Sequence, residues 1–412
     1  MSRRSVVIVG GGYAGVEVAR ALGDRADVTL ISDDNFLLFT PMLAEVAGAD
    51  IDPRHIVAPL RQLCPEAEVV IGTATGFDLE TRTVTVQPPL GRAPRTYRGD
   101  ALVLSVGSES TDFGIPGVAE WALPFKTIGD ALRIRNRVIS MLEEAAAGGD
   151  ASLMSLAVIG AGYSGIEVAA AVNDFMAGAH PEYYPQAPPP TVTVIDALPR
   201  IAPDLTEQLS RTAESVLAER GIRFALGQRV TEVDRRGVIL EDGSRIEART
   251  VIWAAGMKPS VTPDELGLPA EKRRIEVDGN MRAAPGIFAL GDAAAVPDGF
   301  GDISPPNAQH ALRQGRYLGK HLLELLDGVS VEPYRYKMLG QFVSLGHRNA
   351  VGLIFGRPVS GYVGWFLWRT YYLFRLPTLV RKVRVALDWT VDLVFPPDIA
   401  QLPSSDLGPD AV

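Results

Sequence analysis

Two short glycine motifs carry the most recognisable chemistry in this sequence. They are Gly10-Gly11-Gly12-Tyr13-Ala14-Gly15 and Gly160-Ala161-Gly162-Tyr163-Ser164-Gly165. In such a motif the first glycine permits a tight turn, the second lets a pyrophosphate approach the backbone, and the third lets a helix pack closely on a strand. Unpaired N–H groups at the start of that helix then face the phosphates. The spacing therefore predicts two sites that bind dinucleotides.

Each motif stands between a predicted strand and a predicted helix. Apolar, largely β-branched residues precede the motifs at 6–9 and 156–159, and helix-forming residues follow them at 16–22 and 166–171. A strand, a glycine turn and a helix are the context in which this motif binds a dinucleotide. The two stretches match nearly residue for residue, so one structural unit is repeated. The predicted fold class is α/β with two Rossmann-like domains.

An acidic residue is expected where the second strand of each Rossmann unit ends, because it accepts hydrogen bonds from a ribose. Asp196 occupies this place in the second unit and would repel a 2′-phosphate, which favours NAD over NADP, although Arg200 is near enough to keep NADP possible. In the first unit strict register puts Ser32 there. We expect the neighbouring Asp33 to make the contact; alternatively, Asp33 and Asp34 cap a helix or turn.

Further candidate binding residues follow predicted strands. Gly107 and Gly256 each close an apolar strand, and a third strand leads into Gly291-Asp292. There the glycine permits close approach and Asp292 can accept hydrogen bonds from ribityl hydroxyls; a helix cap is the alternative. Pro41 lies in a dense apolar segment, 36–43, which is either plain core or the wall of a site for a flat aromatic cofactor.

Composition limits the classes of function. The 412 residues suit two or three domains, and the net charge of −9 argues against nucleic acid as a partner. Cys64 is the only cysteine, which excludes an internal disulfide and a two-cysteine redox centre and indicates a reducing compartment. We expect no export signal and no bound metal, and no apolar run reaches the roughly 18 residues that span a bilayer.

Three other stretches have a predictable local character. Residues 131–147 have the spacing of an amphipathic helix, with apolar side chains on one face. Residues 177–190 are rich in Pro, Tyr and Ala and are predicted to form a surface loop. Residues 402–412 are predicted to be disordered.

The region 361–395 differs in composition from the rest of the chain. Aromatic residues crowd it, and Arg and Lys are interleaved with them. Pro377 is expected to separate two helices. Aromatic and basic residues on short amphipathic helices suit helices that lie in a membrane interface. The alternative is an aromatic dimer interface or a cover for a domain.

Together these features resemble the two-dinucleotide flavoprotein reductases and, more narrowly, type II NADH:quinone oxidoreductase. The resemblance extends to about Phe395 and is carried by the paired glycine motifs and by residues 39–43, 115–117, 251–259, 286–292 and 305–315. It implies FAD on the first motif and NADH on the second. The implied domains are an FAD-binding domain at 1–113 and 258–330, an NADH-binding domain at 114–257, and a C-terminal quinone and membrane segment at 331–412.

The resemblance also implies roles for single residues. Glu167 lies near nicotinamide and flavin, Ala308 and Gln309 lie beside the flavin ring on the quinone side, and Lys337 falls in a segment that lines the quinone pocket. The sequence departs from the family pattern at Ser32, at Val106 before Gly107, and at Arg313, where a glutamine is usual. The expected cofactor-binding residues are Gly10, Gly12, Tyr13, Ala14, Gly15, Asp33, Pro41, Gly107, Asp292, Gly160, Gly162, Tyr163, Ser164, Gly165, Asp196 and Gly256.

The implied reaction passes hydride from NADH to FAD and then two electrons to a membrane quinone of a respiratory chain, without proton pumping. The implied protein is a peripheral homodimer at the cytoplasmic face of the cell membrane. One alternative is a soluble NADH-dependent flavoprotein that reduces a ferredoxin-like partner. Another is a flavoprotein that senses NADH and turns over slowly.

Overall fold

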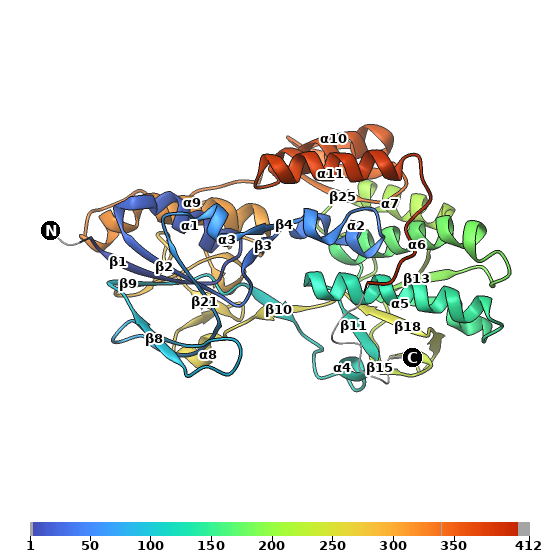
Figure 1. The fold of residues 1–412 in the computed structure, drawn as a ribbon, viewed down its shortest axis with the longest axis horizontal. Coiled ribbons are helices and arrows are strands. Elements are labelled where there is room, and N and C mark those ends of the chain that lie inside the picture. The colour runs from blue at the N-terminus through green and yellow to red at the C-terminus, as the bar shows by residue number, and fades with distance from the viewer. Residues whose placement is uncertain (1–2, 339, 403–412) are drawn as a thin grey trace. The chain divides into compact units, whose positions relative to one another are not determined.

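The computed structural model describes residues 3–338 and 340–402, and the chain forms two compact units (Figure 1). Unit 1 contains Met1–Leu38, Val57–Glu109 and Met257–Met338, and unit 2 contains Phe39–Ile56, Ser110–Gly256 and Leu339–Val412. Both units are α/β, which confirms the predicted fold class. The segment 39–56 and the C-terminal residues group with the middle of the chain. The division of the chain by cofactor stays a prediction.

Unit 1 is built on a six-stranded sheet in the order β22-β23-β9-β1-β2-β5. Its strands are parallel except for the edge strand β22, which runs antiparallel to β23. β1 is almost wholly buried, as expected for a central strand covered on both faces. The sheet strands are β1 (Ser5–Val9), β2 (Asp27–Ser32), β5 (Glu68–Ile71), β9 (Ala101–Leu104), β22 (Arg282–Ala284) and β23 (Ile287–Ala289).

Smaller elements complete unit 1. The helices are α1 (Tyr13–Leu22), α3 (Leu60–Leu63), α8 (Pro263–Leu266) and α9 (Ala308–Leu326), with the short turns η1 (Gly23–Arg25) and η5 (Gly291–Ala293). An antiparallel sheet contains β6 (Thr73–Asp78), β7 (Thr83–Gln87) and β8 (Arg95–Arg98). The other strand groups are β3 (Phe36–Leu38) with β4 (Val57–Pro59), β10 (Ser108–Ser110) with β19 (Met257–Pro259), and β20 (Ala270–Glu271) with β21 (Arg274–Glu276) and β24 (Ala294–Ala295).

Helices α1 and α9 lie side by side in unit 1 because small residues let their backbones approach (Figure 1). A Cβ on Gly315 would stand only 2.4 Å from the carbonyl oxygen of Ala14. An ion pair crosses the same contact, where Arg316 Nε donates to Glu17 Oε2 at 2.6 Å. The contact holds the middle of α9 against the start of α1.

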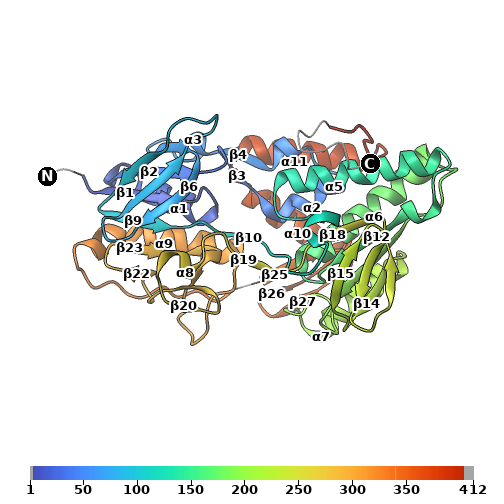
Figure 2. The ribbon, with the colours of Figure 1, turned by 90° about the horizontal axis from the view of Figure 1, so that it is seen from below.

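Unit 2 is built on a five-stranded parallel sheet in the order β11-β18-β12-β13-β14 (Figure 2). Its strands are β11 (Ala122–Pro124), β12 (Ser155–Ile159), β13 (Thr191–Asp196), β14 (Arg223–Leu226) and β18 (Thr250–Trp253). The helices are α2 (Leu43–Ala47), α4 (Val118–Trp121), α5 (Ile128–Ala146), α6 (Tyr163–Tyr183), α7 (Glu207–Glu219), α10 (Gly361–Arg375) and α11 (Leu379–Asp392), with the short turns η2 (Thr40–Met42), η3 (Pro53–His55) and η4 (Ala151–Met154).

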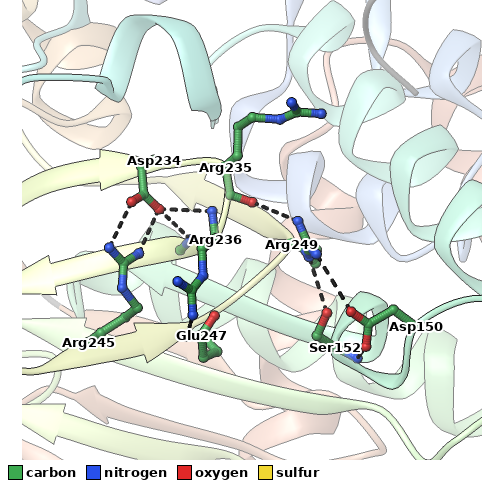
Figure 3. Close-up of polar contacts among 9 residues, drawn as sticks. Asp150, Ser152, Asp234, Arg235, Arg236, Arg245, Glu247 and Arg249 are labelled. Carbon is green, nitrogen blue, oxygen red and sulfur yellow. Dashed lines mark hydrogen bonds and ion pairs between the residues drawn. The ribbon is translucent and has the colours of Figure 1, made fainter.

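Two small antiparallel sheets belong to unit 2. They are β15 (Val230–Asp234), β16 (Gly237–Leu240) and β17 (Arg245–Glu247), and β25 (Gly340–Ser344), β26 (Ala350–Ile354) and β27 (Arg357–Val359). Figure 3 shows charged contacts on the first of them. Arg245 holds both oxygens of Asp234, at 2.6 and 2.8 Å, and this pairing lowers the pKa of Asp234 to about 2. Arg249 Nε donates to Ser152 Oγ at 3.1 Å, which ties the end of this sheet to the turn before β12.

The amphipathic helix predicted at 131–147 is confirmed as α5, which begins three residues earlier at Ile128. Its start is set by a capping box between Thr127 and Asp130. The surface loop predicted at 177–190 is wrong in its first half, because α6 continues to Tyr183 through Pro181. The buried Tyr184 follows and donates its hydroxyl to Glu143 Oε1 at 2.8 Å.

The C-terminal helices α10 and α11 flank Pro377, as predicted. Their indoles Trp368 and Trp389 are buried and lie 6.3 Å apart between ring centroids. Beyond α11 the chain crosses α5, where the buried Asn136 side chain donates to the Leu402 carbonyl oxygen at 2.6 Å and accepts from the Leu402 amide at 3.2 Å. The prediction of disorder is thus wrong for Leu402, and residues 403–412 lie outside the described part of the chain.

Candidate functional site

The first glycine motif forms a narrow backbone turn between β1 and α1. Gly10 has φ +109°, and a Cβ there would lie 2.1 Å from the carbonyl oxygen of Ser105. A Cβ on Gly15 would lie 2.0 Å from the carbonyl oxygen of Gly10, so both positions require glycine. Gly12 differs: its backbone is extended at φ −79°, and a Cβ there would meet nothing within 4 Å. The turn, residues 10–15, therefore forms a cradle that leaves open space over the first N–H groups of α1.

Other backbone turns stand at the same edge of the sheet in unit 1. Gly10, Gly107 and Gly291 follow the carboxyl ends of the parallel strands β1, β9 and β23. Gly107 has φ +71° and open space around a Cβ position, and Asp292 Oδ2 accepts a hydrogen bond from Ser108 Oγ at 2.7 Å. Ligands of such sheets bind outside these carboxyl ends. The open turn, the helix start and the adjacent carboxylate fit the diphosphate and polyol of FAD.

The remaining residues expected around FAD have different surroundings. Ser32 ends β2 half-buried, and its Oγ would lie 2.6 Å from a Cβ on Gly11, whereas Asp33 is exposed. Tyr13 and Ala14 begin α1. Pro41 lies in η2, which belongs to unit 2. Neither the ribose contact of Asp33 nor a cofactor contact of Pro41 is tested by these positions, so both stay predictions.

The second glycine motif repeats this geometry in unit 2. Gly160 has φ +104°, and a Cβ there would lie 2.9 Å from the backbone of Ala254. A Cβ on Gly165 would lie 1.8 Å from the carbonyl oxygen of Gly160, whereas Gly162 again has open space. Gly256 has φ +72° and its Cβ would overlap the Phe113 ring at 2.2 Å. The unit therefore contains a second cradle of the same construction.

Asp196 organises the loop of this second cradle. Its Oδ2 accepts from the Ala161 amide at 2.5 Å and its Oδ1 accepts from the Leu198 amide at 2.7 Å. The carboxylate thus lies at the glycine turn, and its contact with a ribose stays a prediction. Arg200 donates instead to the Pro203 carbonyl oxygen at 2.5 Å. The guanidinium that kept NADP possible is therefore held by the backbone.

Tyr163 and Ser164 begin α6 in different surroundings. Ser164 is exposed at the helix start, whereas the Tyr163 hydroxyl is shielded from water. Burial raises the pKa of Tyr163 well above its usual range, and the charges of Asp204 and Glu167 add to the effect.

The matching glutamates of the two motifs have opposite electrostatic surroundings. Glu17 is paired with two cations, Arg316 at 2.6 Å and Arg20 at 3.2 Å. Glu167 accepts a hydrogen bond from the Ser344 amide at 3.1 Å. Burial raises the pKa of Glu167 to about 8 although this hydrogen bond acts in the other direction, and the negative charge of Glu45 adds to the rise. Glu167 can therefore hold a proton at neutral pH, whereas Glu17 joins two helices.

Glu45 is a second carboxyl that sequence reasoning missed. Its Oε1 accepts from Trp389 Nε1 at 3.0 Å, and its Oε2 is shielded from water with no hydrogen-bond partner. Burial raises the pKa of Glu45 to about 8; Arg369 and the Trp389 hydrogen bond oppose the rise, and Asp392 and Asp388 support it. Asp50, close by, has its pKa raised by burial and by Asp392. No local spacing could reveal this cluster, because its members come from distant segments.

Glu45→Gln is expected to stabilise the protein increasingly as the pH rises from about 5 to 8. The folded pKa of about 8 lies above the ordinary value of 4.5, so the folded state holds a proton that the unfolded state has released in this range. The contribution of Glu45 to the stability of the wild type therefore falls as the pH rises toward 8, and glutamine removes that dependence while it keeps an acceptor for Trp389. Thermal unfolding at several pH values should show a difference in Tm that grows on the order of 5 °C. A difference in Tm that stays constant across this range would contradict the raised pKa.

Ala308 and Gln309 begin helix α9. Asn307 caps the helix by accepting from the His310 amide at 2.9 Å. Gln314 Oε1 accepts from the Gly291 amide at 2.8 Å, which joins α9 to the turn that carries Asp292. Arg313, one residue earlier, donates to the Gln309 carbonyl oxygen at 3.0 Å. Lys337 is exposed in the segment after α9.

Charged contacts hold α10 and α11 in unit 2. Arg369 lies between two indoles, 4.6 Å from the Trp365 centroid and 4.2 Å from that of Trp389. His55 Nδ1 lies 2.5 Å from Asp388 Oδ2, which gives this histidine the structural contact that the sequence alone did not reveal. Inward and outward residues are interspersed along α10 and α11, so composition alone did not distinguish their positions.

The outward side of α10 and α11 is rich in exposed apolar side chains. Phe366, Phe374, Leu379 and Leu387 are 56, 70, 75 and 59% exposed. In residues 3–338 and 340–402 no helix has the length and apolarity to cross a membrane. Among the same residues, no cluster of three or more His, Cys, Asp or Glu side chains could bind a metal ion.

Comparison with known proteins identifies the class first. The family described as pyridine nucleotide-disulphide oxidoreductase matches residues 4–315, as the two cradles suggest. Over 94% of this chain and 88% of the relative, the sequence is 31% identical to type II NADH:quinone oxidoreductase Ndh of Mycobacterium tuberculosis. The chain belongs to the type II NADH:quinone oxidoreductase family, which confirms the resemblance.

Other relatives agree with this assignment. A probable NADH dehydrogenase of Dictyostelium discoideum is 29% identical over 97% of this chain and 92% of its own. The structure of NDH2 from Plasmodium falciparum in complex with NADH covers 97% of this chain and 100% of its own, with a TM-score of 0.91 at 17% identity, so the fold is shared. The NADH-bound water-forming NADH oxidase of Lactobacillus brevis matches with a TM-score of 0.69 at 25% identity, over 85% of this chain and 74% of its own.

Proposed function

We propose that the protein is a non-proton-pumping NADH:quinone oxidoreductase that uses FAD. The observation that carries the proposal is the pair of open glycine cradles, at Gly12 and Gly162, in a chain of this family. The balanced reaction is NADH + H⁺ + quinone → NAD⁺ + quinol. FAD, when bound, accepts hydride from NADH and passes two electrons to the quinone. The residues of the chain itself bind and orient the nucleotides and the quinone, and they supply protons.

The proposal assigns unit 1 to FAD and unit 2 to NADH. Asp292 accepts hydrogen bonds from the polyol of FAD, and Asp196 accepts them from the adenosine ribose of NADH. Glu167 holds or transfers a proton, because burial keeps it protonated at neutral pH. Ala308 and Gln309 contact the quinone side of the site, and Lys337 lies in the segment that lines the quinone pocket.

The proposal also places α10 and α11 on a membrane surface at the cytoplasmic face of the cell membrane. The exposed side chains of Phe366, Phe374 and Leu379 and the exposed Arg384 support this placement. An interfacial helix buries such an apolar face, while basic residues near anionic lipid contribute on the order of 1 kcal/mol each. The same face also suits a homodimer, which sedimentation without lipid would detect. A soluble ferredoxin-type reductase would need no such face.

An anaerobic two-step experiment tests the function. We expect NADH to bleach the absorbance of the bound flavin, and a quinone carried in lipid vesicles then to restore it. A protein that bleaches but reoxidises no faster than a quinone-free control is not a quinone reductase, and a ferredoxin should then be offered. A protein that bleaches only over many minutes would fit the NADH sensor instead.

A further inference from the structure

We propose that Tyr336 and Arg313 are positioning residues that set the orientation of the Gln309 side chain for the quinone. The inference rests on the proposed function, because it assigns Gln309 a contact with that substrate. All three residues belong to unit 1. Gln309 and Arg313 are one turn apart on α9, and Tyr336 lies in the irregular segment that follows the helix.

Gln309 is held at both its backbone and its side chain. Arg313 Nη1 donates to the Gln309 carbonyl oxygen at 3.0 Å, which fastens the first turn of α9. The Tyr336 hydroxyl donates to Gln309 Oε1 at 3.4 Å, which is a long contact, as is common in active sites without substrate. Both contacts come from residues that also touch each other, so they form one assembly.

Tyr336 is itself fixed from three directions. Its amide donates to the Asp298 carbonyl oxygen at 3.0 Å. The Arg313 guanidinium lies 4.1 Å from the centroid of the Tyr336 ring, within the range of a cation–π contact. The His310 ring meets the Tyr336 ring edge-on, with centroids 5.0 Å apart and planes at 71°. Burial lowers the pKa of His310 to about 4, so the imidazole is neutral and does not compete with Arg313 as a cation.

The orientation of a glutamine amide decides what it can recognise. Its oxygen end accepts hydrogen bonds and its nitrogen end donates them, and rotation about the terminal torsion exchanges the two at little cost. A quinone carbonyl oxygen only accepts, so it needs the nitrogen end. In the structure Oε1 faces the Tyr336 hydroxyl, which leaves the nitrogen end for such a substrate.

The assembly also gives a physical reason for Arg313. A neutral amide such as glutamine at this position would make no cation–π contact with an aromatic ring. The arginine here holds the ring of Tyr336 and the carbonyl of Gln309 at once. We therefore expect Arg313 and Tyr336 to act as a pair, with effects that overlap when both are replaced.

The test uses the flavin-loaded full chain and three variants. Tyr336→Phe keeps the ring and removes the hydroxyl, and Arg313→Gln removes the cation over the ring. Tyr317→Phe is the matched control, because Tyr317 lies on α9 like Arg313 and its hydroxyl contacts Asn280 Oδ1 and the Glu332 carbonyl oxygen, each at 2.6 Å, rather than Gln309. The measurements are the Kd of a water-soluble quinone from flavin fluorescence quenching, its KM, the rate of anaerobic bleaching by NADH, and reduction of ferricyanide.

We expect Tyr336→Phe and Arg313→Gln each to raise the quinone Kd and KM by about three- to tenfold, as for loss of one hydrogen bond. Bleaching by NADH and ferricyanide reduction should not change, and the double variant should be little worse than either single one. Tyr317→Phe should match the wild type. The inference is overturned if Tyr336→Phe leaves the quinone Kd unchanged, or if it slows bleaching and ferricyanide reduction by the same factor. A wild type that reduces ferricyanide but no quinone would instead defeat the proposed function.

Discussion

Gly12→Val is expected to give a folded protein that loses its FAD. The backbone of Gly12 is extended, at φ −79° and ψ −169°, which any residue adopts, and a Cβ there meets nothing within 4 Å. The fold therefore tolerates a side chain at this position. The same space is where a pyrophosphate must approach the start of α1, so valine and cofactor compete for it. We expect at least a tenfold fall in flavin bound per polypeptide, on the order of 1.4 kcal/mol or more.

The measurement is the ratio of flavin absorbance to protein after gel filtration, with thermal unfolding recorded after the flavin has been removed from both proteins. Gly129→Ala is the matched control, because Gly129 lies in the first turn of α5 and a Cβ there comes only within 3.7 Å of Thr127 Oγ1. The control should keep its full flavin content. A yellow Gly12→Val protein with normal flavin content would show that the diphosphate does not lie over this turn.

Replacing four outward-facing residues of α10 and α11 with serine is expected to release the protein from lipid. The residues are Phe366, Phe374, Leu379 and Leu387, each at least 56% exposed. Full burial of one such side chain stabilises by about 1.5 to 3 kcal/mol. Burial in a membrane interface is partial, so we expect about 0.7 kcal/mol from each of the four and roughly 100-fold weaker vesicle binding in total. Co-sedimentation with anionic vesicles measures the change. Bleaching of the flavin by NADH should continue unchanged in solution.

Substitution is a sharper test than deleting the helices. Trp368 and Trp389 are 1 and 5% exposed, so a deletion from Gly361 would also remove part of the core of unit 2. The matched control replaces exposed apolar residues far from these helices in the sequence, Leu90 and Phe300, which are 93 and 59% exposed. That control should bind vesicles like the wild type. If the fourfold variant still sediments with vesicles, the membrane contact lies elsewhere.

The two cradles could be predicted from sequence because their signal is local. Gly10 and Gly15 are five residues apart, and the strand and helix that frame them are adjacent in the chain. The positive φ of Gly10 and the close approach of Gly15 to the Gly10 carbonyl oxygen are local requirements that spacing reveals, although Gly10 also packs against the backbone of the distant Ser105. The helix at 131–147 was predictable for the same reason, since its apolar positions repeat at helical intervals.

The end of α6 and the surroundings of the buried carboxyl groups could not be predicted, since they depend on contacts between distant segments. Pro181 suggested a loop, but α6 continues past it and the buried Tyr184 then bonds Glu143 on α5. The raised pKa of Glu45 arises from its burial near Trp389 and Asp392, more than 300 positions later in the chain. The equivalence of Glu17 and Glu167 in sequence also misleads, because Glu17 pairs with Arg20 on its own helix and, by a tertiary contact, with Arg316 on α9.

The interleaving of the two units has a consequence for how the protein can be handled. Each unit draws on three separate stretches of the chain, and the stretches alternate along it. No single cut liberates an intact half, so limited proteolysis should not yield one autonomous fragment. During synthesis neither half can close until material from beyond residue 256 has left the ribosome, which makes early, incomplete nascent chains a natural substrate for chaperones.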